Sequence, residues 1–359
     1  MVVKISQWPP VRQWPAALQW LVLVGAGGGF GWALARLHVP AAAMLGPLVV
    51  GAVLAMRGAS VRVPVAAHQL AQGIAGCLIA LHIEPGVLAR TAELWPVIGI
   101  FVVLTFAAAC VTGFVAGAVT GIDREVAIWG FLPGMAGTVI AIAHERGLDS
   151  RMVAFIQILR LMVVIAVMVV ATMALAGPAT LPLTGDQPVT LMSGLTAASI
   201  ALVGLAVARW LPALPAGASL VPLALAAGLS VSGISVAMPD WLVAAGFLGL
   251  GLQIGLRFTP DLLRTGLRAL PAVMVASLLL IALCALSGGL LALIAGVDLM
   301  SALLATVPGS IDSIAIIAIT SGADVSFVMT LQTVRLFAVA LIGPLIAQRL
   351  VRLVLRQPG

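Results

Sequence analysis

The chain contains its own sequence twice, and this internal repeat limits its fold more than any other feature. Residues 40–64, PAAAMLGPLVVGAVLAMRGASVRVP, align without a gap with residues 215–239, PAGASLVPLALAAGLSVSGISVAMP, and 12 of the 25 positions are identical. The same repeat offset, which pairs Pro40 with Pro215, holds to near the end of the chain, where it pairs Arg160 with Arg335. A duplicated chain predicts internal pseudo-symmetry, an architecture that is common among secondary transporters.

The composition predicts an integral membrane protein. Hydrophobic residues make up 62% of the chain and charged residues 8%, whereas a soluble domain carries roughly 25% charged residues. A water-soluble fold of this composition has too few polar side chains to cover its surface. The 18 basic residues are scattered between apolar segments. They form no basic stripe, so nucleic acid is not an expected partner, and they serve as topology signals instead.

Each repeat contains six apolar stretches, to be compared with the roughly 17–25 residues of a crossing helix. The stretches lie at residues 15–35, 40–56, 67–83, 95–120, 126–143 and 152–176, and at 190–209, 215–237, 241–256, 270–295, 300–319 and 327–348. Prolines and glycines in residues 177–189 predict a linker. The expected domains are therefore a first membrane repeat, 1–176, and a second, 190–359.

The placement of lysine and arginine favours ten crossings over twelve. If all twelve stretches cross, the basic residues of the loops and tails divide eight to eight between the two sides. If the fifth stretch of each repeat enters and leaves on one side, they divide fourteen to two. If instead the third stretch of each repeat does not cross, the basic residues divide eleven to five. The sequence thus predicts an all-α membrane fold of two inverted repeats, each with about five crossings, and both termini in the cytoplasm.

The fifth stretch of each repeat contains a Pro-Gly pair, in FLPGMAGT at residues 131–138 and in TVPGSIDS at residues 306–313. Proline removes a backbone donor and glycine loosens the backbone, so we expect a re-entrant hairpin or a broken helix at each site. A packing kink is the alternative. A helix that starts after the break would point free N–H groups at a cavity, a site suited to an anion. The residues expected to bind a solute here are Pro133, Gly134, Thr138, Pro308, Gly309, Ser310 and Ser313.

The sixth stretch of each repeat carries a Gln-x-x-Arg motif, Gln157 with Arg160 and Gln332 with Arg335. An arginine near mid-membrane costs a few kcal/mol unless it is paired or hydrated. Residues three apart share one helix face, so we expect all four side chains to bind solute. The arginines have several candidate partners: a nearby aspartate, the carbonyls of the Pro-Gly loops, or an anionic substrate. A purely structural ion pair is the alternative.

Three aspartates are candidates for coupling transport to a cation. Asp312 lies in the second Pro-Gly stretch, where the first repeat has Gly137, and a lone carboxylate there is suited to binding H+ or Na+. A salt bridge to one of the arginines is the competing role. Asp149 and Asp324 are placed equally well to cap helices.

Gln72 and Gln253, in the third stretches, have no counterparts at the repeat offset. Such amides either line a cavity or bond to a neighbouring helix. The sequence leaves both roles open.

The ordered recurrence of Pro-Gly, Gly-x-Asp and Gln-x-x-Arg in both halves resembles the AbrB family of duplicated bacterial membrane proteins. The resemblance covers about residues 40–349 and is strongest in PGSIDSIAIIAITSGADVSFVMTLQTVR, at 308–335. The first half departs from the second by placing His144-Glu145-Arg146 opposite Ile319-Thr320-Ser321. The family carries the labels ammonia monooxygenase, membrane regulator and transporter. The resemblance therefore implies a fold and a place in the bacterial inner membrane more than an activity.

An enzyme is not expected from the residues. The four histidines are far apart and show no metal-ligand spacing, so neither a metal, a cofactor nor monooxygenase chemistry is expected. A DNA-binding regulator would need a soluble recognition domain, for which the chain has no sequence signature.

The leading expectation is a secondary transporter for a small anionic or polar solute, which binds between the repeats near the bilayer midplane. Its expected partners are the lipid bilayer and that solute, with H+ or Na+ as candidate coupling ions and a homo-oligomer as a candidate assembly. The alternative is a membrane regulator or sensor that transports nothing and acts through a partner protein.

Overall fold

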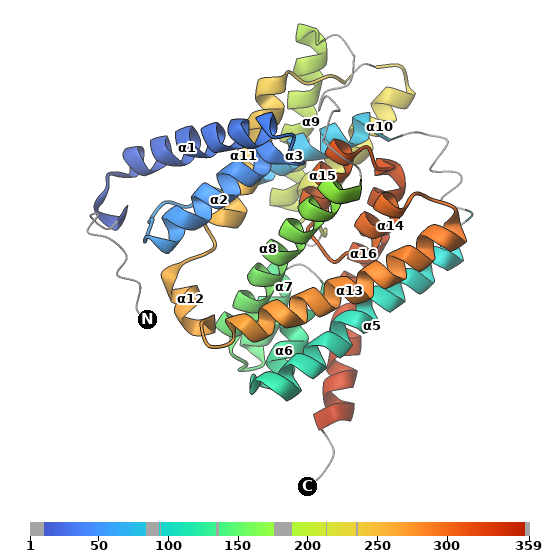
Figure 1. Ribbon diagram of the computed structural model, residues 1–359. Helices are drawn as coiled ribbons and strands as arrows, with labels where there is room; N and C mark the ends of the chain where they lie inside the picture. The colour runs from blue at the N-terminus through green and yellow to red at the C-terminus, as the bar shows by residue number, and fades with distance from the viewer. Residues whose placement is uncertain are drawn as a thin grey trace.

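The computed structural model describes residues 11–83, 93, 95–133, 136–175, 189–212, 214–234 and 236–355, with the backbone alone for 136–138 and 341–355. Every regular element in this part of the chain is a helix (Figure 1). A short 3-10 helix, η1, spans Val11–Gln13. The helices of the first half are α1 (Ala16–Arg36), α2 (Ala42–Met56), α3 (Val65–Leu81), α5 (Trp95–Thr120), α6 (Arg124–Phe131), α7 (Ala136–Glu145) and α8 (Ser150–Leu175). Those of the second half are α9 (Leu191–Trp210), α10 (Gly217–Val231), α11 (Asp240–Gly255), α12 (Pro260–Gly266), α13 (Leu270–Ala295), α14 (Leu299–Thr306), α15 (Ile311–Ser321) and α16 (Val325–Leu355).

The helix boundaries repeat with the offset seen in the sequence. The first residues of α1, α2, α3, α5, α6, α7 and α8 pair at this offset with the first residues of α9, α10, α11, α13, α14, α15 and α16 respectively. Even strained backbone recurs, since Ala41 before α2 has φ 55° and Ala216 before α10 has φ 50°. Of the predicted linker, 177–189, only Val189 lies within the described residues.

A Gly-x-Asp sequence forms four of the turns between helices. It lies at residues 121–123, 147–149, 296–298 and 322–324. All four glycines have a left-handed φ of 63–73°. Glycine adopts this conformation at little cost because it has no Cβ, and the conformation ends the preceding helix. All four aspartates accept backbone N–H groups of the next helix at 2.8–3.1 Å, as N-caps do. The motif therefore builds a sharp helix-to-helix turn.

The fifth stretch of each repeat is broken, as the Pro-Gly pairs predict. In the second repeat α14 ends at Thr306 and α15 begins at Ile311. In the first repeat α6 ends at Phe131 and α7 begins at Ala136. Each stretch is thus two short helices, of 8 and 10 residues in the first repeat and 8 and 11 in the second.

Helices pack across the repeats in exchanged pairs. The helix α2 packs on α11, and α3 packs on α10, so each pair joins a helix of one half to a non-equivalent helix of the other. Two glycines mark these crossings. A Cβ on Gly76 would overlap the Ser219 carbonyl oxygen, and one on Gly251 would overlap that of Met44. The two contacts are equivalent, because the repeat offset pairs Gly76 with Gly251 and Met44 with Ser219.

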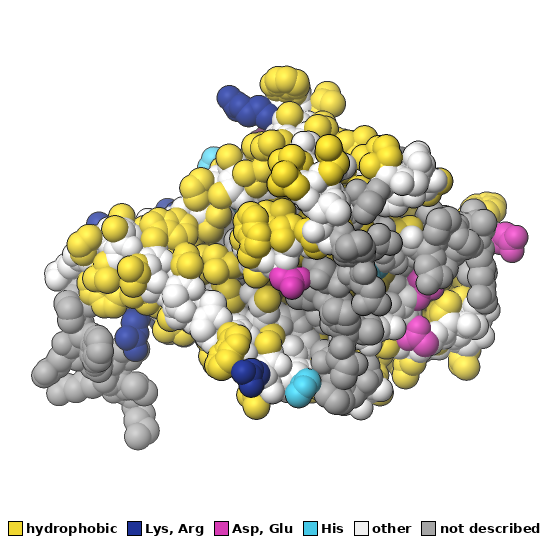
Figure 2. Space-filling model, turned by 90° about the horizontal axis from the view of Figure 1, so that it is seen from above, with side chains coloured by type: hydrophobic (Ala, Val, Ile, Leu, Met, Phe, Trp, Pro, Cys, Tyr) yellow, Lys and Arg dark blue, Asp and Glu magenta, His cyan; other side chains and the backbone are white. Residues whose placement is uncertain are grey.

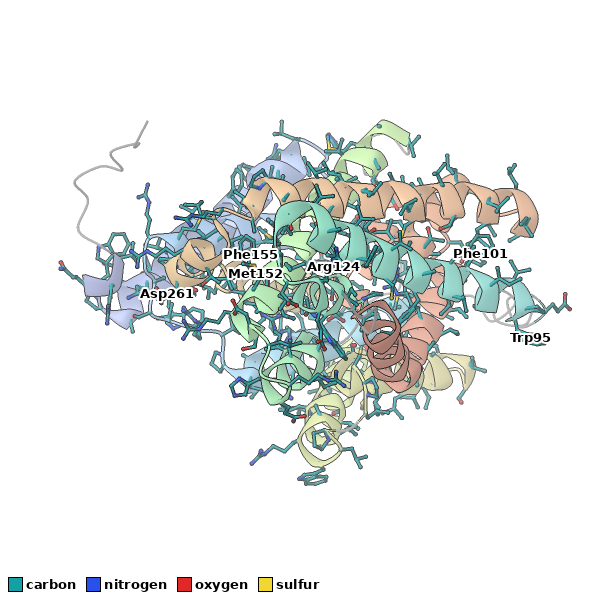
Figure 3. All side chains as sticks on the ribbon, turned by 90° about the horizontal axis from the view of Figure 1, so that it is seen from below. Trp95, Phe101, Arg124, Met152, Phe155 and Asp261 are labelled. Atoms are coloured by element: carbon teal, nitrogen blue, oxygen red, sulfur yellow. The ribbon has the colours of Figure 1, made fainter. Side chains whose placement is uncertain are left out.

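The long helices α5 and α13, which are counterparts, lie side by side. Figure 3 shows Trp95, the first residue of α5, at the right, and Arg124, which follows this helix, to its left. In Figure 1 α13 begins at the left, after α12, and ends at the right. The two helices therefore run in opposite directions.

The contacts divide the helices into two groups, each of which contains helices of both halves. Group A consists of α1, α2, α3, α9, α10 and α11, and group B of α5–α8 and α13–α16. The principal contacts between the groups are those of α15 with α3, together with α12, which follows α11 and packs on α8. In Figure 3 Phe155 of α8 lies near α12, which carries Asp261. The halves of the sequence are thus interlaced, and the main boundary in space runs between groups A and B.

Five of the described helices are long and apolar enough to cross a membrane: α1, α5, α8, α9 and α13. The bent pair α11 and α12 would make a sixth. The ten crossings that the charge bias favours are therefore not reproduced by helix length, because α2, α3 and α10, which lie in stretches expected to cross, have only 15–17 residues. At 1.5 Å per residue, 15 residues span about 22 Å of a hydrocarbon core about 30 Å thick.

The surface agrees with a membrane protein. Large hydrophobic side chains are well exposed on the long helices, among them Leu21, Val103, Val119, Leu286 and Leu293. Figure 2 shows a face made largely of hydrophobic side chains with few charged ones between them. Exposed apolar surface of this extent is stable only against another apolar phase.

Candidate functional site: a polar cavity between the two helix groups

A cavity of about 490 Å³ lies between groups A and B. Group A contributes polar side chains from α3 and α10, including Gln72 and Ser219. Group B contributes Arg160 of α8, Arg335 of α16 and the start of α15. Both Pro-Gly breaks reach the cavity, through Pro133 in one and Gly309 in the other. A mostly apolar chain therefore gathers costly polar groups at one internal place.

The two Gln-x-x-Arg motifs cap the helices that end at the breaks. Arg335 donates through Nη1 to the Val307 carbonyl at 2.7 Å and through Nη2 to that of Gly309 at 3.2 Å. Gln332 donates to the Leu304 carbonyl at 2.7 Å and receives a hydrogen bond from Arg335. Because α14 stops there, these carbonyls are open to side-chain donors, and the Val307 carbonyl also accepts from the Gly309 N–H at 2.9 Å. A cation at this negative end of the helix is favourable.

The first repeat has a similar arrangement, although its arginine bonds the carbonyl one residue earlier than the repeat offset predicts. Arg160 donates to the Phe131 carbonyl at 2.5 Å, and Gln157 donates to the Trp129 carbonyl at 3.5 Å. Trp129 pairs with Leu304 at the repeat offset, so both glutamines reach equivalent carbonyls. Among the partners that the sequence allowed for the arginines, the structure selects the carbonyls at the Pro-Gly breaks. Neither arginine has a carboxylate within 4.0 Å among the described residues.

Asp312 is buried at the first turn of α15 and lines the cavity. Its Oδ2 accepts a hydrogen bond of 3.0 Å from Gln72 Nε2, and Ser219 also lies beside the carboxyl group. It forms no salt bridge with the described residues. The salt-bridge alternative for Asp312 is therefore not observed among the described residues.

The sequence-predicted site residues divide into three sets. Those that line the cavity are Pro133, Gln157, Arg160, Gly309, Ser310, Asp312, Ser313 and Arg335. Gln332 acts beside it as a helix cap, Pro308 lies within the second break, and Asp149 and Asp324 cap α8 and α16 without lining the cavity. Gly134 and the side chain of Thr138 lie outside the described residues.

Group A supplies lining residues that were not predicted as site residues. The polar ones among them are His68, Gln69, Gln72, Ser219, Gln253 and Arg257. Gln72 and Gln253 had a signal, since each is an amide in an apolar stretch without a counterpart in the other half. For Ser219 the only signal was its alignment with Met44. Among the described residues, no group of three or more His, Cys, Asp or Glu side chains could hold a metal ion.

Comparison with known proteins places the chain in a family. A family model described as "Transition state regulatory protein AbrB" matches residues 53–351. The chain is 34% identical over 318 residues to "Putative regulator AbrB" of Escherichia coli (strain K12), covering 87% of this chain and 90% of that protein. It is 25% identical over 293 residues to "Uncharacterized protein YhjN" of Bacillus subtilis (strain 168), covering 77% and 76%. These matches confirm the resemblance seen in the motifs, and the chain belongs to the AbrB family of membrane proteins.

Proposed function

We propose that this protein is a secondary transporter for a small anionic or polar solute, which binds in the cavity between groups A and B. The observation that carries the proposal is the cavity itself. It is bounded by both Pro-Gly breaks and by Arg160, Arg335 and Asp312, all buried in an otherwise apolar chain. Ionisable groups inside a membrane protein are costly, and they usually mark a solute or ion pathway.

The proposed architecture is a pair of inverted repeats in the bacterial inner membrane, with both termini in the cytoplasm. Two observations support the inversion: α5 and α13 run in opposite directions, and the crossings of α2 with α11 and of α3 with α10 are exchanged pairs. Contacts that exchange in this way arise when a two-fold axis relates the two halves.

The proposed mechanism is alternating access by movement of one group against the other. The groups meet mainly at α15 with α3 and through α12, so a relative movement would disturb few contacts. Asp312 is the proposed coupling residue, because its carboxylate lies at this boundary and bonds to group A through Gln72. Binding of H+ or Na+ there would change the strength of the link between the groups.

Uptake into liposomes tests the proposal. Purified protein is reconstituted, and the flux of a panel of radiolabelled anions and amines is compared with that into empty liposomes. We expect saturable uptake of at least one solute, and its loss in Arg160→Gln. Arg264→Gln, a change in an exposed arginine of α12 outside the cavity, serves as the control. Absence of flux across the panel, or equal flux in Arg160→Gln, would contradict the proposal.

A membrane regulator is the second candidate function, because the relative in Escherichia coli carries that name. In that case the same cavity would bind a signal molecule, and a soluble partner would read out the change in shape. Ligand binding to purified protein without flux, together with co-purification of a soluble partner, would favour this function over transport.

A further inference from the structure

The cavity contains polar atoms that have no partner, and these indicate what its ligand must offer. Six buried side-chain atoms of the described residues make no hydrogen bond, and five of them belong to residues that line the cavity. The sixth, Thr112 Oγ1 on α5, does not. A native fold leaves few buried polar atoms without a partner, and those it does leave often face a missing ligand or water.

Two of these atoms need an acceptor from the ligand. Arg160 Nε is a donor that remains free after Nη1 has bonded to the Phe131 carbonyl. Ser313 Oγ can donate as well. Both residues are more than nine-tenths buried, at 7% and 1% exposure. Beside them α15 begins at Ile311, and the side chain of its N-cap, Ser310, makes no capping hydrogen bond. The first N–H groups of α15 thus favour an anion.

Two further atoms need a donor from the ligand. They are Asp312 Oδ1 and Gln157 Oε1, from residues that are 7% and 4% exposed. An amide oxygen and an ionised carboxylate oxygen can only accept. A ligand that offers acceptors alone, such as a simple inorganic anion, would leave both unpaired at a cost in binding.

The charges of the lining residues favour a ligand that carries a carboxylate. Among the described lining residues, Arg160, Arg257 and Arg335 face one carboxylate, that of Asp312. Arg160 and Arg335 lie close enough for their charges to interact. The cavity therefore has an excess of positive charge, which favours a carboxylate over an amine or a neutral polyol.

We propose that the solute is a small carboxylate that carries a hydrogen-bond donor on the carbon next to its carboxyl group, as in a 2-hydroxy acid or a 2-amino acid. The carboxylate lies at the start of α15, where Arg160 Nε and Ser313 Oγ donate to it. The adjacent hydroxyl or ammonium group donates to Asp312 Oδ1 and Gln157 Oε1. This inference rests on the proposed function, since it names the substrate class for the same cavity.

Binding of three probes that share a three-carbon skeleton tests the inference. Propionate has the carboxylate alone, L-lactate adds a hydroxyl group and L-alanine adds an ammonium group. Calorimetric titration of the full-length protein in nanodiscs gives the three dissociation constants. We expect lactate or alanine to bind at least about tenfold more tightly than propionate, because a site built to accept a donor discriminates against a ligand that lacks it. Comparing lactate with alanine also shows whether the site prefers a hydroxyl or an ammonium group as the donor.

Two substitutions test whether Asp312 and Gln157 cause the preference over propionate. Asp312→Ala should abolish the preference over propionate, and Gln157→Leu should reduce it, while both still bind propionate. Thr112→Val is the matched control, because it removes a buried unpaired hydroxyl away from the cavity and should leave the preference unchanged. If Asp312→Ala does not fold, as judged by gel filtration, Gln157→Leu carries the test of the preference, and Ser313→Ala should weaken the binding of all three probes alike.

The outcomes separate this inference from the proposed function. Equal affinity for all three probes, or a preference that persists in both substituted proteins, overturns the inference. If none of the three binds while another solute is transported in an Arg160-dependent manner, the inference fails and the transporter stands. If no solute is transported and no probe binds, both fail.

Discussion

Gln72 of α3 donates a hydrogen bond of 3.0 Å to the Asp312 carboxylate of α15, 240 residues further along the chain. The bond lies at the boundary between groups A and B and beside the cavity. It joins the candidate coupling residue to the group against which its own group would move. A change in the charge of Asp312 therefore acts directly on the contact between the groups.

A double-mutant cycle should detect this link. Gln72→Leu and Asp312→Ala are combined, and the unfolding free energy is measured by SDS titration in mixed micelles. We expect an interaction energy of about 1–3 kcal/mol, as for a hydrogen bond to a buried charged group. The control pair is Gln69→Leu with Asp312→Ala, because Gln69 lines the same cavity from the same helix. Additive effects in the Gln72 pair would contradict the link.

Substitution of Arg335 should lower the unfolding free energy more than substitution of an exposed arginine. Arg335→Ala removes the guanidinium donors of the Val307 and Gly309 carbonyls, and we expect a loss of about 2–4 kcal/mol in unfolding free energy. Arg335→Lys should recover part of it, since a lysine cannot reproduce the fork of the guanidinium. Arg264→Ala, in an exposed ion pair, should change stability by less than about 0.5 kcal/mol. Equal losses at the two arginines would refute the capping role.

The equivalent crossings of α3 with α10 and of α11 with α2 should respond alike. Gly76→Ala and Gly251→Ala each drive a Cβ into a carbonyl oxygen of the facing helix, so both should destabilise by about 1–3 kcal/mol or more. Gly28→Ala and Gly289→Ala, where nothing lies within 4 Å, should be neutral or slightly stabilising. Thermal unfolding in detergent gives the ranking, and a large effect at only one of the two crossings would argue against equivalent halves.

Labelling of single cysteines tests the inversion of the repeats. Glu145→Cys follows the first broken stretch and Ser321→Cys the second, in a background whose native cysteines, all buried, are replaced by alanine. We expect a membrane-impermeant maleimide added to intact cells to label Ser321→Cys, on the periplasmic side, and to spare Glu145→Cys until the membrane is opened. Labelling of both from the same side would exclude the proposed topology.

The sequence predicted well those features of the fold that recur in both halves. The constant repeat offset predicted matching helix starts, because caps and breaks are local and each half carries its own copy of Gly-x-Asp and Pro-Gly. The sequence did not decide which partner Arg160 and Arg335 bond to, because only the packed structure shows that α6 and α14 end within reach of these arginines.

Other features depend on contacts that no local pattern encodes. His68, Ser219 and Arg257 reach the cavity because group A packs against group B, a contact that the sequence around each residue does not encode. Membrane crossing is likewise decided by more than apolar composition. The predicted stretch 215–237 folds into a helix of 15 residues that ends at Val231, because the turn at Gly233, with φ 81°, ends it early.

Uptake measured with the two groups locked together tests the account most directly. The Ala41 N–H, before α2 of group A, donates to Thr320 Oγ1 of α15 in group B at 3.2 Å, so Ala41→Cys with Thr320→Cys can be joined by a short bifunctional thiosulfonate. If the groups move against each other during transport, the solute enters liposomes before cross-linking, is excluded after it, and enters again once the link is reduced. Uptake that continues unchanged in fully cross-linked protein, or that is absent in every state, would contradict the account.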